Sequence, residues 1–142
     1  MRACGVKLYY KLTSGGSYTQ LIGLKRLKPP QEKRGVVEDS DLDSCATGAL
    51  KSLGTLEPGD FSFSLRYTTA KKTTMQSIKN NGETWWKIEM PLQDGQAIPD
   101  NLEFRAFITD DNFSDFTPDQ NAVVTLDATA ALMATYTFNA GS

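Results

Sequence analysis

The acidic segment Asp39-Ser40-Asp41-Leu42-Asp43 is the part of the sequence that comes closest to the spacing of a metal site. Its alternating aspartates match the first ligands of an EF-hand calcium loop. Ser44, however, stands where that loop needs a glycine, and Leu50 stands where it needs a bidentate glutamate. The segment therefore predicts no calcium site, and we expect neither a metal nor a cofactor. A second group of acids is interpreted as solvated loop surface: Asp110, Asp111, Asp115 and Asp119.

The sequence contains no histidine, which is the commonest general base and metal ligand. Ser-His-Asp, Cys-His and His-based zinc chemistry are excluded with it. Cys4 and Cys45 are too few for a disulfide scaffold and do not form a Cys-x-x-Cys motif, so we interpret them as reduced thiols. No glycine-rich phosphate loop or nucleophile elbow is present. We therefore predict that the protein is not an enzyme.

The adjacent pair Trp85 and Trp86 is the feature that most suggests a ligand. Neighbouring residues of a strand point to opposite faces, so one indole belongs to the core and the other to the second face of the sheet. An outward tryptophan on a β-sandwich can stack on a sugar ring. A carbohydrate-binding module is thus one hypothesis. Packing of the outer indole against a helix or a neighbouring subunit is the alternative.

Positive and negative charge are separated along the chain. Residues 1–90 hold 14 Lys and Arg against 9 Asp and Glu, whereas residues 91–142 hold one base against eight acids. Opposite potentials can meet when copies of such a chain associate head to tail. Solvated surface charge without a partner is the alternative. The basic run from Lys25 to Arg34 lacks interleaved aromatic residues and a nucleic-acid motif, so it predicts no sequence-specific DNA site.

The stretch from Pro58 to Tyr67 organises the expected fold. Phe61, Phe63, Leu65 and Tyr67 alternate with Ser62, Ser64 and Arg66, which places four large apolar side chains on one face of a strand. A chain of 142 residues, 39% hydrophobic and 23% charged, is typical of one globular domain spanning residues 1–142. No apolar run approaches the ~20 residues of a membrane-spanning helix.

Similar alternation predicts strands over residues 6–12, 18–24, 84–90, 102–108, 122–132 and 133–138, with a polar loop at 110–121. In the second strand Ile22 is placed on the face shared with Tyr18 and Leu24, opposite Leu21. A helix is expected from Thr68 or Thr69 to Asn81, followed by Gly82 at its C-terminal cap. Met75 and Ile78 should be buried there, and Lys71, Lys72 and Lys79 solvated. Together these strands and the helix predict an antiparallel β-sandwich or open barrel with one short α-helix.

Residues 25–57 interrupt this pattern and predict a long extended loop, or arm. Irregular connections beyond about 12–15 residues tend to be functional or disordered. Apolar residues scattered along the arm indicate that it is ordered against something, such as a neighbouring subunit. A flexible surface loop is the alternative. The residues assigned to this inter-subunit arm are basic and acidic, with one leucine among them: Lys25, Arg26, Lys28, Lys33, Arg34, Asp39, Asp41, Leu42 and Asp43.

The order of these elements resembles the major tail tube proteins of phages with long, non-contractile tails, which share a fold with type VI secretion tubes. The segment Asp39–Ser44 is similar to the Asp-x-Thr-x-Leu-Asp-Ser segment of that family, with Ser40 in place of threonine. The stretch Leu56–Tyr67 is similar to its Gly-Leu-x-Asp-x-Gly-x-x-x-Phe-x-Leu-x-Tyr region. The glycine that the family often has near the end of its last strand has no clear counterpart, because Gly141 comes later.

The resemblance implies a structural virion protein that polymerises as stacked hexameric rings into a tail tube, a channel for genome ejection. It implies a location in the virion tail after assembly in the host cytoplasm, and no membrane partner. Expected partners are other copies of the chain, the tape-measure, distal tail and tail terminator proteins, and passing double-stranded DNA without sequence-specific binding. An acidic lining would let DNA slide, and Glu103 and Asp127 are the candidates for it.

Overall fold

The computed structural model describes residues 4–39, 50–118 and 123–142. The elements follow one another as β1 (Lys7–Lys11), β2 (Thr19–Leu21), β3 (Leu24–Lys28), β4 (Lys33–Asp39), β5 (Leu50–Glu57), β6 (Asp60–Arg66), α1 (Thr69–Asn81), β7 (Thr84–Glu89), β8 (Asn101–Phe113), β9 (Thr125–Leu132) and β10 (Thr137–Asn139). The mainly β architecture with one helix confirms the predicted fold class.

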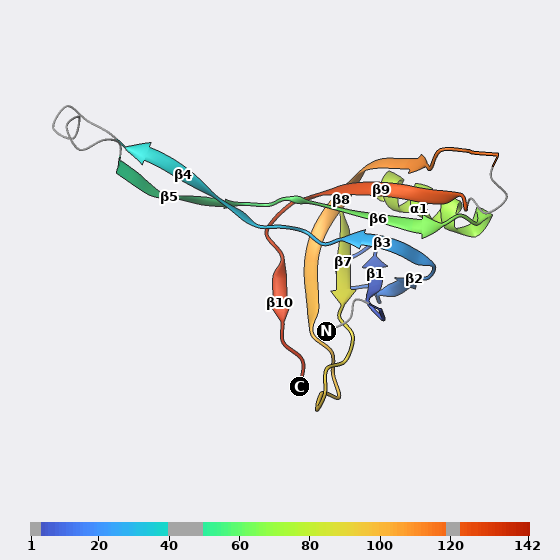
Figure 1. Ribbon diagram of the computed structural model, residues 1–142, viewed down its shortest axis with the longest axis horizontal. Helices are drawn as coiled ribbons and strands as arrows, with labels where there is room; N and C mark the ends of the chain where they lie inside the picture. The colour runs from blue at the N-terminus through green and yellow to red at the C-terminus, as the bar shows by residue number, and fades with distance from the viewer. Residues whose placement is uncertain (1–3, 40–49, 119–122) are drawn as a thin grey trace.

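In the described part of the chain, eight strands form the main antiparallel sheet in the order β2-β1-β7-β8-β9-β6-β3, with β10 added to β8. β8 belongs to two layers, because residues 101–106 pair with β7 whereas residues 106–113 pair with β9. We call β3, β6, β9 and residues 106–113 the horizontal layer, after their direction in Figure 1. The vertical layer comprises β2, β1, β7, β10 and residues 101–106.

The two layers enclose a single aromatic core. Phe61 and Phe63 of β6 lie against Trp86 of β7, with ring centroids 5.1 and 5.5 Å apart, and Phe61 also meets Phe104 of β8 at 4.8 Å. All four rings are buried. Truncating a buried aromatic side chain to alanine typically costs about 3–5 kcal/mol. The strand predicted to organise the fold is therefore the strand that joins its layers.

Helix α1 begins and ends as the sequence predicts. The Thr68 hydroxyl accepts a hydrogen bond from the backbone N–H of Lys71 at 3.2 Å and caps the first turn. Gly82 ends the helix with a φ of 80°, which glycine adopts without a Cβ clash. Met75 and Ile78 are fully buried. α1 lies at the end of the horizontal layer that is remote from the β4–β5 hairpin (Figure 1).

The arm is more regular than predicted. β4 and β5 form a separate two-stranded antiparallel sheet that projects from the body of the protein (Figure 1). The first part of the predicted loop is strand β3, which pairs with β6 in the main sheet. Strand β3 continues the horizontal layer, so the projecting segment starts at Lys33 and ends at Glu57.

Three further details differ from the sequence analysis. Strand β2 ends at Leu21, which is buried, and Ile22 is 69% exposed because Gly23 turns the chain with a φ of 88° before β3. β8 continues through Phe113 into the predicted polar loop. Its register shifts between Ile108 and Asp110, which hides the continued alternation in the sequence.

Candidate assembly interface

The horizontal layer has two open edges. Among the described residues, β3 pairs with β6 alone, and residues 107–113 of β8 pair only with β9. The unpaired backbone groups of such edges invite pairing with another strand. Both edges belong to one layer, which makes that layer the part of the molecule that a second copy could extend on either side.

The outward face of the horizontal layer is mainly polar, with Phe107 and Ala131 as apolar members. Its residues pair across the strands on the side opposite the buried Phe61, Phe63 and Leu65. The face carries hydroxyl groups and balanced charges from four strands: Arg26, Lys28, Asp60, Ser62, Ser64, Arg66, Asp110, Asn112, Thr125, Asp127 and Thr129. A sheet face of this composition needs no protein cover.

Asp127 lies at the centre of this face. Its carboxylate accepts hydrogen bonds from the Ser64 hydroxyl at 2.7 Å and from the Thr125 hydroxyl at 3.1 Å. The pairing of Ser64 with Asp127 across β6 and β9 makes the first contact possible. These bonds fix the carboxylate on the sheet surface and leave its charge turned outward.

Glu103, the other predicted lining residue, lies elsewhere. It belongs to the vertical layer, on the face turned away from the core, where it lines a cleft of about 340 Å³ with Tyr18 and Trp85. Burial raises the pKa of the Tyr18 hydroxyl above its ordinary value, and the Glu103 carboxylate adds to the effect. Glu103 and Asp127 are thus on the outer faces of two different layers and are not brought together.

The cleft beside Trp85 is bordered by stacked cations and rings. Lys87 Nζ lies 4.8 Å from the Tyr9 ring centroid and 4.9 Å from that of Tyr18, and Lys11 Nζ lies 4.5 Å from the Tyr18 ring centroid. Trp86 is buried whereas Trp85 is half-buried on the opposite face, which confirms the expected division between the two indoles.

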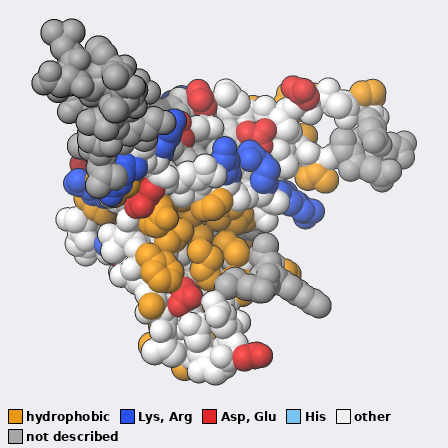
Figure 2. All heavy atoms as spheres, turned by 60° about the vertical axis from the view of Figure 1, so that its left-hand side comes forward, with side chains coloured by type: hydrophobic (Ala, Val, Ile, Leu, Met, Phe, Trp, Pro, Cys, Tyr) orange, Lys and Arg blue, Asp and Glu red, His pale blue; other side chains and the backbone are white. Residues whose placement is uncertain are grey.

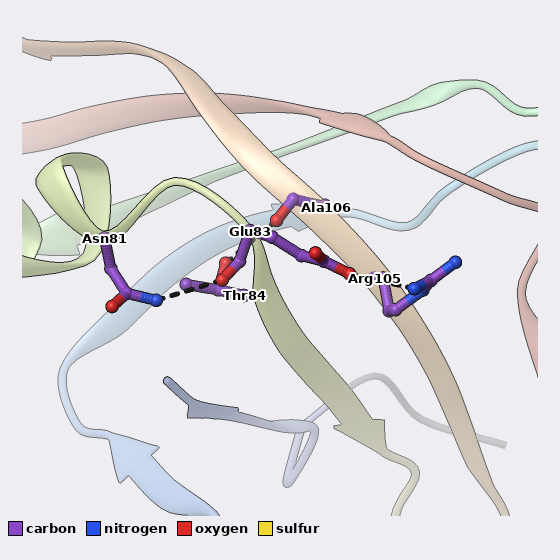
Figure 3. A network of polar contacts seen from close by, with 5 residues as sticks. All are labelled: Asn81, Glu83, Thr84, Arg105 and Ala106. Atoms are coloured by element: carbon purple, nitrogen blue, oxygen red, sulfur yellow. Dashed lines mark hydrogen bonds and ion pairs between the residues drawn. The ribbon is translucent and has the colours of Figure 1, made fainter. Parts of the chain in front are cut away.

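A network of polar contacts holds the point where the chain passes from α1 into β7 of the vertical layer (Figure 3). Glu83 forms an ion pair with Arg105 of β8 at 2.9 Å, and the Asn81 side-chain amide donates to the Glu83 carbonyl at 3.0 Å. The buried Thr84 hydroxyl donates to the Ala106 carbonyl at 2.9 Å. The start of β7 is therefore tied to β8 where that strand passes from one layer to the other.

The residues predicted for the arm fall into three groups. Lys25, Arg26 and Lys28 belong to β3, at one open edge, where Arg26 Nη1 donates to the Ser62 hydroxyl at 3.5 Å. Lys33 and Arg34 begin β4, and Asp39 ends it. The remaining three lie outside the described residues: Asp41, Leu42 and Asp43.

The interpretation of Lys72 and Asp111 as solvated is wrong. Lys72 Nζ forms an ion pair with Asp111 Oδ2 at 3.1 Å, and only 2% of the Asp111 side chain is exposed. Asp111 lies on the core side of β8 because the register shift after Ile108 reverses the alternation. The two residues are 39 positions apart in the sequence, so no local pattern predicts the contact between them.

Apolar groups are also exposed. Figure 2 shows hydrophobic side chains gathered beneath a row of Lys and Arg side chains. Phe107, Phe113, Phe116 and Phe138 are each more than two-fifths exposed. Within the ranges described, no helix is long and apolar enough to cross a membrane, and no group of three acidic or cysteine side chains is arranged as metal ligands.

Solved structures with the same fold come from phage tails and phage-like injection systems. A chain of the sheath/tube terminator of an extracellular contractile injection system, PVC, has a TM-score of 0.74 and 13% identity, covering 99% of this chain and 96% of that one. A chain of the six-fold symmetrised baseplate of the anti-feeding prophage has a TM-score of 0.73 and 9% identity, with 95% and 92% covered.

The tail tube of SPP1 has a TM-score of 0.65 and 14% identity, covering 95% of this chain and 76% of that one. No protein-family model matches the sequence, and the comparison with curated proteins gives no match. At these identities the likeness concerns the fold. The chain has the fold of the proteins that build the tubes of phage tails and related injection systems.

Proposed function

We propose that the protein is a structural subunit that polymerises as stacked hexameric rings into a tail tube, through which a genome passes into the host. The observation that carries this proposal is the horizontal layer, which has a polar outward face and an open edge on either side. A ring of copies would close both edges, and closure is the complete solution to the exposed edge of a sheet.

The strand directions make this closure possible. β3, β6, β9 and β8 are each antiparallel to the next, so β3 and β8 run in opposite directions. Rotation about a ring axis preserves the direction of each strand along that axis. β3 of one copy therefore meets β8 of the next in antiparallel orientation, the same arrangement as within the layer.

Charge favours the same junction. The β3 edge carries Lys25, Arg26 and Lys28, and the β8 edge carries Asp110. Opposite potentials at the two edges would direct copies into head-to-tail contact and disfavour contact between like edges. The basic residues of β3 and one acid from the C-terminal part of the chain would thus lie at the two edges that meet.

In this arrangement the polar face lines the channel. Asp127 lies on it, whereas Glu103 lies on the other side of the protein and faces the outside of the tube. The balanced charge of the face, together with its hydroxyl groups, gives the regularly spaced phosphates of DNA no continuous basic surface to bind. DNA is therefore a passing partner without sequence-specific contacts.

The β4–β5 hairpin is assigned to contacts between copies, because it projects beyond the layers that form the core. It would reach an adjacent ring. The ends of the tube would bind the distal tail and tail terminator proteins, and its lumen the tape-measure protein, after assembly in the host cytoplasm. The assignment is structural and requires no catalysis, cofactor or membrane contact.

Negative-stain microscopy of the concentrated chain, with and without a tail-initiating complex, tests the proposal. Rings and tubes with a central channel are expected. A monodisperse monomer under every condition would contradict it. Tubes that form but carry the polar face on their outside would contradict the assignment of the channel while leaving self-assembly intact.

The cleft beside Trp85 favours a second function, the binding of a saccharide on the outer surface. The Trp85 indole and the Glu103 carboxylate both line it, so an aromatic surface and polar groups face one cleft. Such a combination suits a sugar ring. A glycan array with the protein and with Trp85→Ala tests it, and the absence of any signal from the unmodified protein would dismiss it.

A further inference from the structure

An apolar hollow opens beneath the β3 edge. It has a volume of about 500 Å³ and is lined by Val6, Leu24, Leu27, Ile88 and Met90, with Lys25 and Arg26 at its border. Except for Ile88, these apolar side chains are only partly buried, although they pack against the core. Among the described residues, nothing fills the hollow.

A pair of exposed phenylalanines follows the other edge. Phe113 is 42% exposed at the end of β8, and Phe116 is 74% exposed just beyond it. Their ring centroids are 6.1 Å apart, and Phe113 also contacts the Tyr67 ring at 5.3 Å. We call Phe113 and Phe116 the aromatic knob. Exposed apolar groups of this size are typical of protein contact sites.

The hollow and the knob lie on the same side of the horizontal layer. Leu24 pairs with the buried Leu65, and Leu27 pairs with the buried Phe63, so both point toward the core side of β3. Phe113 pairs with the buried Leu126, which places it on the core side of β8. Cross-strand partners share a face of the sheet, so both features lie behind the polar face, at opposite edges.

The antiparallel junction between β8 of one copy and β3 of the next would bring the knob beside the hollow. The end of β8 at Phe113 would lie beside the beginning of β3 at Leu24, where the hollow starts. The charges agree as well, because Asp115 accompanies the knob and Lys25 and Arg26 border the hollow. A second copy of the chain therefore offers an occupant of matching polarity, charge and position.

We propose that the aromatic knob of one copy enters the hollow beneath β3 of the next copy around the ring. This inference rests on the proposed function, to which it adds the contact that anchors neighbouring subunits. Burial of two aromatic side chains at the centre of a charged rim is the arrangement that concentrates binding energy in protein interfaces.

Cross-linking tests the contact directly, because the exposed thiol of Cys4 lines the hollow. In the full chain with Cys45→Ser, Phe116→Cys should be linked to Cys4 of a neighbouring copy by a short bis-maleimide within assembled tubes. A denaturing gel should then show a ladder up to the hexamer. Phe107→Cys is the control, since Phe107 is also an exposed aromatic residue (41%, against 74% for Phe116) but pairs with Ala131 on the polar face.

A second cysteine variant tests whether the hairpin, instead of the aromatic knob, fills the hollow. If Leu56→Cys at the base of the hairpin links to Cys4 and Phe116→Cys does not, the hairpin fills the hollow and the inference is overturned. Tubes that assemble but give no ladder with Phe116→Cys would overturn it while the proposed function stands. Failure of the unmodified chain to form rings or tubes, even with a tail-initiating complex, would remove both.

Phe116→Ser provides an independent measurement. The unfolding temperature of the monomer should not change, because the only ring contact of Phe116 among the described residues is with Phe113. The concentration required for tube assembly, followed by light scattering, should rise about tenfold or more. An unchanged assembly concentration would contradict the inference.

Discussion

Lys72 of α1 and Asp111 of β8 form an ion pair, 3.1 Å from Nζ to Oδ2, that fastens the helix to the strand shared by both layers. The Asp111 side chain is almost completely buried, and its Oδ1 has no hydrogen-bond partner among the described residues. Lys72 Nζ also lies 4.8 Å from the centroid of the Phe113 ring. The same lysine thus holds the helix and supports the base of the aromatic knob.

Replacement of Lys72 by methionine should destabilise the protein by about 3 kcal/mol, because it leaves a buried carboxylate without its cation. Urea unfolding of the monomer measures this loss. Lys79→Met in the last turn of the helix is the control, since Lys79 is exposed. The double variant Lys72→Met with Asp111→Leu should regain most of the stability. Equal stability of the Lys72 and Lys79 variants would show that the ion pair contributes nothing.

The free energy of unfolding should fall with pH above about 10, where an ordinary tyrosine loses its proton. The raised pKa of Tyr18 means that the folded state retains this proton longer than the unfolded state. The stabilisation is therefore complete below the unfolded pKa and is lost as pH rises through the folded one. Denaturant titrations between pH 8 and 11 should show a weaker decline for Tyr18→Phe.

The two causes of this pKa shift can be separated from each other with a second variant. Burial is the larger cause and Glu103 the smaller, so Glu103→Gln should lower the pKa of Tyr18 only in part. Ultraviolet absorbance of tyrosinate follows the titration, with Tyr18→Phe identifying the signal. A titration of Tyr18 at the ordinary tyrosine value in the unmodified protein would contradict the expectation.

Removal of the hairpin should separate folding from assembly. The variant replaces residues 33–57 by two glycines, which is feasible because Gly59 lies against the Gln31 backbone and β3 already pairs with β6. We expect a folded monomer with an unfolding temperature close to that of the complete chain, and no tubes in the microscope. Tubes of normal length would exclude the hairpin from contacts between rings.

Charge reversal tests the junction between β3 and β8. Lys28→Glu or Asp110→Lys alone should raise the assembly concentration by about tenfold, because each places like charges at the junction. The two changes combined in one chain should restore assembly. The defects should shrink at high salt, which screens exposed charges. Failure of the double variant to recover would indicate that these residues do not face one another.

The sequence predicted the elements that depend on local pattern. The alternation from Phe61 to Leu65 is preserved in β6, and the caps of α1 follow from Thr68 and Gly82. Tyr67, predicted as the fourth apolar residue of that strand face, lies beyond the end of β6 and is exposed. It did not predict the hairpin, because the residues of β4 and β5 lack a clear period of two. It also ended β8 too early, because the shift at Ile108 changes which residues face the core.

The candidate interface was harder to predict from the sequence than the helix and the strands were. The two open edges arise from the order of strands that are distant in sequence, and the division of β8 between two layers sets the opposite orientations of Glu103 and Asp127. The acidic and basic segments were recognisable. The placement of the basic residues of β3 and of Asp110 on opposite edges of one layer required the topology.

The continuity of β8 has a mechanical consequence. In a tube, outward pressure on the channel wall would pass into the surrounding layer along covalent backbone, without having to cross the side-chain packing between the layers. The stretch from Ala106, where the strand changes partners, to the register shift after Ile108 is then the place at which each subunit would bend first. Flexibility of the whole filament would depend on this short stretch as much as on the joints between its rings.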